Sequence, residues 1–412
     1  MEKVKLYKIY KSLVYVSIFF LYYILFLNQA LMRPGPLGNF ASDISSHIVR
    51  DNINAISANY YLHESWLSLL ALDYEPFIHM LTALVAILIH FISQSTERLD
   101  LANAMALILS LAKLSEFFIT KVILDNSVKL SETESIFITV IINFCTVLYL
   151  PFINLNIYFP MLSPNVLHNP TSIVLTPLSI VFFYWYIKLY INSKAISYKR
   201  TLLFGLLLIT ATLVKPAFTN VMLIVIALYY LFHLKRFISK LLWHDLLIFT
   251  PSAILILYQI HIISKSNFGT IAFAPFKVID YYTQHPIITL LQAIEFPLLI
   301  TAIYFITNRN KSNNYLIFSW LFTLIAYLIW SLFYLTGSTW THGNLAWPYA
   351  LSLTFLYIFS IATYVLLLVN SDVTTKGRIY NFMINLGAVN LCFIFLSGLN
   401  QFIKVYLGGD WM

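Results

Sequence analysis

Long apolar runs separated by short polar loops are the feature that most restricts how this chain can fold. The runs reach about 20 residues without alternating between apolar and polar positions, so they predict membrane-spanning α-helices and not barrel strands. Of the 412 residues, 60% are hydrophobic and 10% are charged, and the mean hydropathy is +0.79. Soluble domains carry about 25% charged residues. We therefore predict an all-α polytopic membrane protein with a single integral membrane domain, 1–412, and no soluble domain.

The limits of the apolar runs place the predicted spans. These are 12–32, 76–94, 101–124, 135–151, 172–193, 201–214, 217–233, 244–262, 289–307, 315–335, 348–369 and 379–398. Short basic loops mark the cytoplasmic side by the positive-inside rule, and they are 193–201, 235–240, 308–311 and 376–378. The basic N-terminus, "MEKVKLYKIYK", is also expected in the cytoplasm as the start of an uncleaved span, because the apolar run that follows exceeds that of a signal peptide. The loops predicted to face outside are 33–75, 152–171, 263–288 and 336–347.

The number of crossings before the loop 152–171 does not fit this orientation. If "QSTERLD" (94–100) is cytoplasmic, an odd number of crossings must follow, yet two apolar segments do, 101–124 and 135–151. Segment 101–124 contains three charged side chains, Lys113, Glu116 and Lys121. It is therefore the more doubtful span. We expect about 11 spans, with 10 to 13 possible, and surface helices in the first outside loop, 33–75.

The net charge of +8 does not predict a nucleic-acid partner, because the basic residues lie in short loops between apolar runs. The two cysteines, Cys145 and Cys392, both lie in apolar segments. They predict neither a disulfide framework nor a cysteine metal site. We expect no metal and no cofactor.

An acid and an imidazole follow the first predicted span. Asp43 and His47 are four residues apart and share one face if the segment is helical. Asp43 could act as a general base that takes the proton of an attacking hydroxyl. Asp43 could equally be the N-cap of a surface helix, and Asp51 or Glu64 could be the base instead.

Two further polar groups lie at the starts of spans. His79 follows Pro76, and a histidine there is either interfacial or functional. In "PNVLHNPT", His168 and Asn169 precede Pro170. Pro suits the first turn of a helix, whose free N–H groups favour an anion. This stretch therefore predicts either a site for phosphate or sugar hydroxyls or ordinary helix capping.

Lys215 separates two apolar runs in "LVKPAF", at a turn predicted to face outside. Its ammonium could pair with a lipid phosphate or simply extend to the membrane interface. The loop "STWTHGNLAWPY" holds His342 and Asn344 among tryptophans. Such a mixture suits a sugar ring, or else an interfacial aromatic belt.

These polar groups all fall on the predicted outer side, whereas the apolar runs carry few charges. A transporter is expected to place ionisable or helix-breaking residues at mid-bilayer. The pattern therefore favours an enzyme with a site that opens at the outer face of the membrane.

The chain resembles GT-C-type membrane glycosyltransferases, particularly those of bacterial surface-polysaccharide and O-antigen (lipopolysaccharide) gene clusters. The motifs that carry the resemblance are "SDISSH", "EPFIHML", "PNVLHNPT", the "KP" of "LVKPAF", and "HGNLAWPY". The resemblance implies a GT-C-like bundle in the cytoplasmic (inner) membrane. It also implies a hexosyltransferase that moves a sugar from a polyprenyl-phosphate donor to a lipid-linked or surface glycan acceptor at the outer, periplasmic face.

The resemblance also implies roles for individual residues. Asp43 would be the base of an inverting transfer, and Lys215 would hold the phosphate of the donor lipid. The donor and acceptor cleft would be lined by His47, His79, His168, Asn169, His342 and Asn344. Two alternatives stay open: a polysaccharide polymerase or ligase with another lipid-linked donor, and a flippase or other transporter of lipid-linked oligosaccharides.

Overall fold

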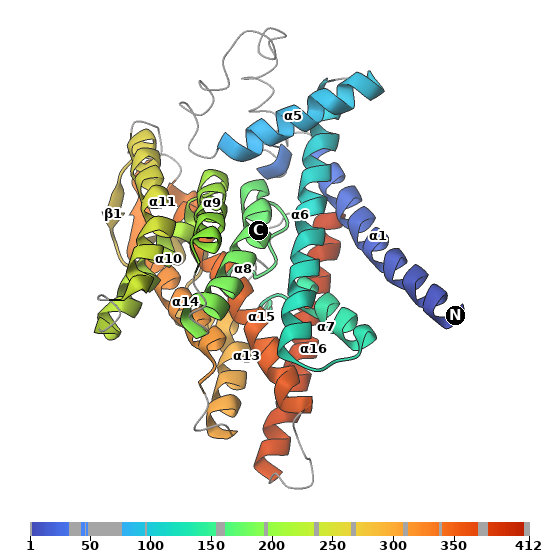
Figure 1. The fold of residues 1–412 in the computed structure, drawn as a ribbon, viewed down its shortest axis with the longest axis vertical. Coiled ribbons are helices and arrows are strands. Elements are labelled where there is room, and N and C mark those ends of the chain that lie inside the picture. Colours follow the sequence, from blue (N-terminus) through green and yellow to red (C-terminus); the bar gives the residue numbers. More distant parts are fainter. Residues whose placement is uncertain are drawn as a thin grey trace.

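Figure 1 shows a computed structural model of the chain, in which nearly every described element is a helix. The structure describes residues 2–32, 43–45, 47, 76–94, 97–153, 161–192, 197–234, 239–264, 269–307, 312–337, 340–369 and 378–407. The long elements before the middle of the chain are α1 (Glu2–Leu31), α5 (Pro76–Ser93), α6 (Glu97–Ser127), α7 (Glu132–Phe144) and α8 (Pro170–Tyr186), which continues as the π-helix η1 (Ile187–Asn192). Next come α9 (Tyr198–Val214), α10 (Ala217–Phe232) and α11 (Lys240–Ser264). The remaining elements are β1 (Ile271–Phe273), α12 (Lys277–Tyr282), α13 (Pro286–Thr307), α14 (Asn314–Leu332), β2 (Phe333–Leu335), the 3-10 helices η3 (Trp340–His342) and η4 (Asn344–Ala346), α15 (Trp347–Val369) and α16 (Arg378–Tyr406).

Seven helices within the described residues are long and apolar enough to cross a membrane. They cover Tyr10–Leu31, Pro170–Asn192, Lys240–Ile262, Pro286–Thr307, Asn314–Leu332, Asn344–Val369 and Arg378–Tyr406. Two shorter apolar helices are Phe77–Ser93 and Ala217–Phe232. The prediction of an all-α, multi-pass membrane protein is confirmed at this level.

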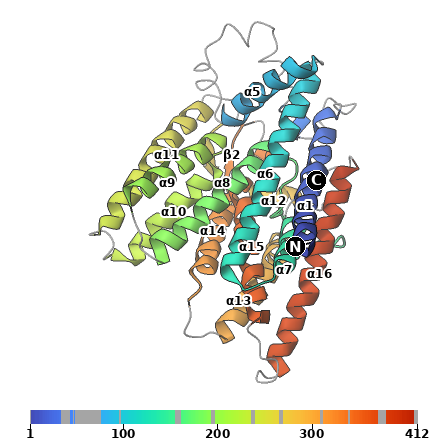
Figure 2. The same cartoon turned by 45° about the vertical axis from the view of Figure 1, so that its right-hand side comes forward.

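The helix α15 forms the centre of the bundle. In its apolar window 83% of the residues are buried inside the protein, against 22% for α16. It packs against α8, α13 and α14, and α10 and α6 also contact it (Figures 1 and 2). Because α16 is apolar yet mostly exposed in the isolated chain, its outer face suits lipid contact.

The two helices α1 and α6 run in opposite directions along one another. The hydroxyl of Tyr23, in the second half of α1, donates to Asn103 Oδ1 near the start of α6 at 2.7 Å. At the other end, Lys11 forms an ion pair with Glu132, at the start of α7, at 2.6 Å. The start of α6 therefore lies on the same side of the bundle as the end of α1.

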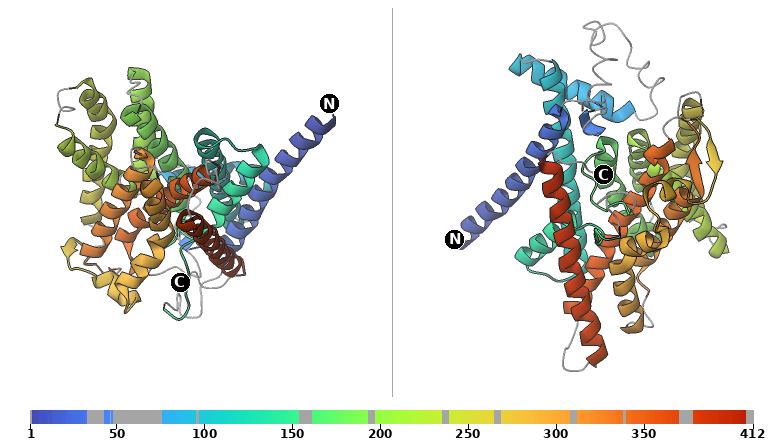
Figure 3. Two further views of the ribbon diagram at one scale, coloured as in Figure 1. Left: turned by 90° about the horizontal axis from the view of Figure 1, so that it is seen from below. Right: turned by 180° about the vertical axis from the view of Figure 1, so that it is seen from behind.

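The helix α5 begins and ends on that same side. In the first turns of α5, the ring of His79 stacks on the ring of His47. His47 lies close to the end of α1, since the nearby Ser45 donates to the carbonyl of Met32 at 3.0 Å. Near its last turn, His90 contacts Asp100 of α6 at 2.6 Å. Figures 1 and 3 show α5 lying across the end of the bundle, steeply inclined to α6.

These contacts bear on two predicted spans. Segment 101–124 was the more doubtful span on account of its charges; α6 is one unbroken helix of 31 residues, about 46 Å long, but it is not among the described helices that are apolar enough to cross a membrane. Segment 76–94 was expected to cross, but α5 begins and ends on the same side of the bundle. The charges of α6 are accommodated because Lys113 and Glu116 are buried as a pair, with Lys113 Nζ 2.9 Å from Glu116 Oε2.

The helix α7 is shorter than its predicted span, 135–151. A capping box of Ser131 and Glu134 starts it, and it ends at Phe144 after 13 residues, about 20 Å. The chain then runs non-helically beside α16, where Thr146 N donates to the carbonyl of Ile394 at 3.1 Å. A side chain at Gly398 would collide with the carbonyl oxygen of Phe144, so glycine permits this close approach. Non-helical backbone is tolerated at membrane depth when protein groups satisfy it in this way.

A small sheet joins the predicted outside loop 263–288 to the last residues of the predicted span 315–335, just before the loop 336–347. The strands β1 and β2 pair antiparallel, with Ile271 opposite Leu335 and Phe273 opposite Phe333. The loops 263–288 and 336–347 are thereby held side by side.

Candidate functional site

Asn169 begins the helix α8 and is the centre of a polar cluster. Its backbone is extended (φ −102°, ψ 109°), and its side-chain Oδ1 accepts a hydrogen bond from Ser172 N at 2.9 Å. Pro170 occupies the first helical position, where no N–H is needed. Asn169 is therefore a helix N-cap, which is the second of the two interpretations given for "PNVLHNPT". Capping uses only its oxygen and leaves its amide NH2 group for another contact.

Lys215 reaches this N-cap because Pro216 interrupts the helix. A proline disfavours helical backbone in the residue before it, and Lys215 is extended (φ −168°, ψ 128°) between α9 and α10. The side chain is 6% exposed. Its ammonium donates to Asn169 Oδ1 and to Thr171 Oγ1, each at 3.0 Å, and lies 4.4 Å from the centre of the Trp347 ring. Lys215 thus points into the protein rather than extending to the membrane interface.

Asp43 contacts the same amide from the opposite side. Asn169 Nδ2 donates to Asp43 Oδ2 at 3.2 Å. One carboxamide therefore stands between a carboxylate and an ammonium, with its NH2 group toward Asp43 and its oxygen toward Lys215. Three segments far apart in sequence meet here, and all three were predicted to face the same side of the membrane.

The Asn169 side-chain oxygen is contacted by three hydrogen-bond donors, one more than its number of lone pairs. Lys215 Nζ, Thr171 Oγ1 and Ser172 N all lie within 3.0 Å of it. A carboxamide oxygen offers two lone pairs. The start of α8 adds the positive end of a helix dipole. A buried ammonium and the positive end of a helix dipole favour a negative charge nearby, and Asp43 is a carboxylate in contact with this cluster.

His168 lies beside this cluster and is neutral near pH 7. Its ring faces Trp347 at a centroid distance of 5.6 Å, and its side chain is 1% exposed. Burial lowers the pKa of His168 to about 4, with Asp43 opposing and Lys215 adding to the shift. A neutral imidazole offers one donor and one acceptor, which suits a sugar hydroxyl.

The low pKa of His168 predicts a pH-dependent stability. The unfolded chain binds this proton near the ordinary pKa of 6.5 and the folded protein only near 4. Stability should therefore fall as the pH drops from about 6.5 to about 4, by about 3 kcal/mol in total. The measurement is melting of the detergent-solubilised protein, followed by maleimide labelling of the buried Cys145 in a Cys392→Ser background. His168→Gln should flatten the pH slope, and equal slopes for both proteins would contradict the assignment.

His47 and His79 form a second pair at the edge of this cluster. Their rings stack at a centroid distance of 5.4 Å and an interplanar angle of 20°. Residues 43–45 and 47 are helical, so His47 is close to Asp43 along the chain. Their roles stay predictions.

The late loop places Asn344 outside the contacts described around Asn169, and its role in the cleft stays a prediction. Asn344 lines a separate hollow with Trp330, Tyr334 and Trp340, and none of its described contacts reaches Asn169. Asn344 is linked to the first cluster only along the chain, because Trp347, which belongs to that cluster, follows one turn later. The backbone of His342 belongs to η3, but its side chain lies outside the described residues, as do Asp51 and Glu64.

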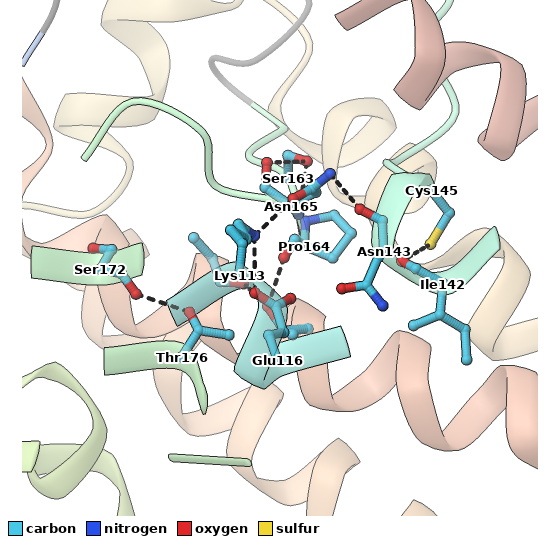
Figure 4. A network of polar contacts seen from close by, with 12 residues as sticks. Lys113, Glu116, Ile142, Asn143, Cys145, Ser163, Pro164, Asn165, Ser172 and Thr176 are labelled. Atoms are coloured by element: carbon cyan, nitrogen blue, oxygen red, sulfur yellow. Dashed lines mark hydrogen bonds and ion pairs between the residues drawn. The ribbon is translucent and has the colours of Figure 1, made fainter. Parts of the chain in front are cut away.

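The loop 161–169, which delivers His168 and Asn169, is held by contacts that sequence analysis did not foresee. Lys113 Nζ donates to Asn165 Oδ1 at 2.9 Å, and Asn165 Nδ2 donates to the carbonyl of Asn143 at 2.6 Å (Figure 4). Gln29 donates to the carbonyl of Leu167 at 3.0 Å, and Thr354 to that of Pro164 at 2.7 Å. The available signal was the presence of Lys113, Glu116 and Gln29 in apolar helices, where polar groups are costly.

Within the described residues, no group of three or more His, Cys, Asp and Glu side chains could hold a metal ion. Comparison of the chain with protein-family models, with curated proteins and with solved structures found no match.

Proposed function

We propose that the chain is a membrane glycosyltransferase of GT-C type that uses a polyprenyl-phosphate-linked sugar as donor and a lipid-linked or surface glycan as acceptor. The single observation that carries the proposal is the placement of Asp43 and Lys215 on the two sides of Asn169. Sugar transfer from a lipid phosphate needs a base for the acceptor hydroxyl and a cation for the departing phosphate. Asn169 contacts both groups, through its NH2 group and its oxygen.

The proposed transfer takes place in one displacement. The acceptor hydroxyl oxygen forms a bond to the anomeric carbon of the donor sugar, and its proton passes to the Asp43 carboxylate. The bond between the anomeric carbon and the phosphate oxygen breaks, and its electron pair leaves on the polyprenyl phosphate. Lys215 and the positive end of the α8 dipole stabilise that charge. Attack opposite to the leaving group inverts the anomeric centre.

The proposed topology follows from α5 lying at the outer interface rather than crossing. Eleven crossings then remain, by α1, α6, α7 with the chain after it, α8, α9, α10, α11, α13, α14, α15 and α16. The N-terminus is cytoplasmic, and the cluster around Asn169 opens at the outer face of the cytoplasmic membrane. Nucleotide sugars are absent there, so a lipid phosphate has to carry the activated sugar.

The buried pair of Lys113 and Glu116 is the observation that most favours a transporter, since ionisable groups inside a membrane commonly mark ion pathways. However, Lys113 also donates to Asn165 and thereby supports the loop of the candidate site. A supporting role explains the pair without a transport step.

The test is transfer of labelled sugar by the purified protein in lipid nanodiscs. Donors would be undecaprenyl-phosphate-linked hexoses, with undecaprenyl-diphosphate oligosaccharides added to detect a polymerase or ligase. Acceptors would be lipid-linked glycans extracted from bacterial membranes. Transfer from a monophosphate donor supports the proposal. Transfer only from diphosphate donors, or flipping of lipid-linked glycans without transfer, would contradict it.

Lys215→Met should weaken donor binding. The variant keeps the apolar stem but loses a charge-assisted contact of about 2–3 kcal/mol, which corresponds to a roughly 30- to 150-fold weaker affinity for undecaprenyl-phosphate hexose. Lys188→Met is the matched control, because Lys188 also lies over an aromatic ring, Trp185, but at the opposite end of α8. Equal donor affinity in native protein and Lys215→Met would remove Lys215 from the site.

A further inference from the structure

A shallow aromatic hollow lies beside the candidate site, one helical turn before Trp347. It is lined by Trp330, Tyr334, Trp340 and Asn344, among others. It is small, with room for about one water molecule (about 10 Å³), and it is partly open to the surface. An open hollow with aromatic walls suits a ring that stacks on it rather than a ligand that is enclosed.

Two buried donors beside this hollow have no hydrogen-bond acceptor among the described residues. They are the indole Nε1 of Trp330 and the hydroxyl of Tyr349, on side chains 3% and 1% exposed. The two rings stack at a centroid distance of 5.3 Å. Trp330 also lines an adjoining hollow that reaches Met161, at the start of the loop leading to His168. Buried polar groups without partners require an explanation, and hydroxyl groups of a bound molecule provide one.

Lys277 adds a cation to the rim. Its ammonium lies 3.9 Å from the centre of the Tyr334 ring and 5.2 Å from that of Trp340. The Lys277 side chain is exposed, and no carboxylate of the described residues lies within 4.0 Å of its ammonium. An ammonium against aromatic faces keeps its donors available for an incoming acceptor group.

A strained backbone holds Lys277 in this place. The residue before it, Phe276, has φ +60°, which is rare for a bulky side chain and costs of order 1–3 kcal/mol. Phe276 N donates to the carbonyl of Ser331 at 2.6 Å, which ties α12 to the end of α14. The hydroxyl of Tyr282 donates to the carbonyl of Thr341 and fixes the turn that carries Trp340.

We propose that this hollow binds a pyranose ring of the acceptor glycan, with Trp340 and Tyr334 stacking on the sugar face, Asn344 bonding its hydroxyls, and Lys277 selecting an acidic substituent. That the bound sugar belongs to an acceptor rests on the proposed function. The recognition chemistry itself does not, because an apolar ring face and a polar edge are properties of any pyranose.

The test measures binding directly, without catalysis. Saturation-transfer NMR would compare methyl glycosides of glucose, galactose, mannose, N-acetylglucosamine and glucuronic acid on the nanodisc-embedded protein. At least one glycoside should receive saturation, and Trp340→Leu should reduce the signal at least fivefold. Trp243→Leu is the control, since Trp243 is 69% exposed on α11. Absence of saturation for all five glycosides, or equal signals in Trp340→Leu and native protein, overturns the assignment.

The charge preference has its own outcome. The glucuronide should bind more tightly than the glucoside, and Lys277→Met should abolish the difference. Equal binding of the two glycosides by native protein overturns the role of Lys277. In the transfer assay, Trp340→Leu should raise the acceptor KM about tenfold with the donor KM unchanged. Binding without any transfer refutes only the proposed function, whereas transfer without binding at this hollow refutes only the present inference.

Discussion

Replacing Asp43 by asparagine should lower the transfer rate by about 10²–10⁴-fold, the range expected for loss of a general base. The amide has the size of the carboxylate, and its oxygen can still accept the hydrogen bond that Asn169 Nδ2 now gives to Asp43 at 3.2 Å. It cannot take the proton of the acceptor hydroxyl. Donor affinity should stay within about twofold of native, because the Lys215 contacts are untouched.

The matched control for this substitution is Asp280→Asn. Asp280 is exposed on α12, and its loss should leave transfer unchanged. The measurements are single-turnover rates with saturating donor and donor binding on the same preparations. A native transfer rate in Asp43→Asn would contradict the assignment of Asp43 as the base and leave Asp51 and Glu64 as the candidates. A loss of donor binding together with rate would assign Asp43 a structural role instead.

Replacing Lys113 by methionine should destabilise the protein by about 3–5 kcal/mol, since removal of one partner leaves the other as an uncompensated buried charge. Lys113 and Glu116 are 1% and 4% exposed, and the ammonium donates to both Glu116 and Asn165. The double variant Lys113→Met/Glu116→Leu should recover most of the stability, because a well-packed apolar pair can replace a buried ion pair. Thermal exposure of Cys145 in the Cys392→Ser background measures both changes.

The double variant also separates support of the site from stability. It lacks the Lys113 contact to Asn165, four residues before Asn169, so its transfer rate should stay below native even where its melting temperature is restored. Lys129→Met is the control, since Lys129 is exposed in the loop between α6 and α7. Equal melting temperatures of single and double variants would show that Glu116 is not left charged and buried. A fully active double variant would limit the pair to stability.

The helices themselves were largely predictable. Apolar length predicted the seven long spanning helices, and the break at Lys215 and Pro216 appears where proline chemistry requires it. The contacts of Asn169 with Asp43 and Lys215 bring together three residues that were grouped by their shared predicted side of the membrane and by the family resemblance, while their roles stay predictions. A positive-inside assignment narrows the position of a residue to one surface, and a small bundle offers few places on that surface.

Three features followed only from tertiary structure. The inclination of α5, the pairing of Lys113 with Glu116 and Asn165, and the position of Asn344 beside Trp330 and Tyr334 all go beyond what the sequence indicated. Apolar length and charge are properties of a segment, and they report whether it can enter a membrane but not at what angle it lies. That angle, and which buried charge meets which partner, depend on packing against other helices. By itself the sequence determined an all-α membrane bundle with polar clusters on one predicted side. The tertiary structure alone decided that Asn169 would stand between Asp43 and Lys215, because each of the three comes from a different segment and only helix packing brings them within hydrogen-bond distance.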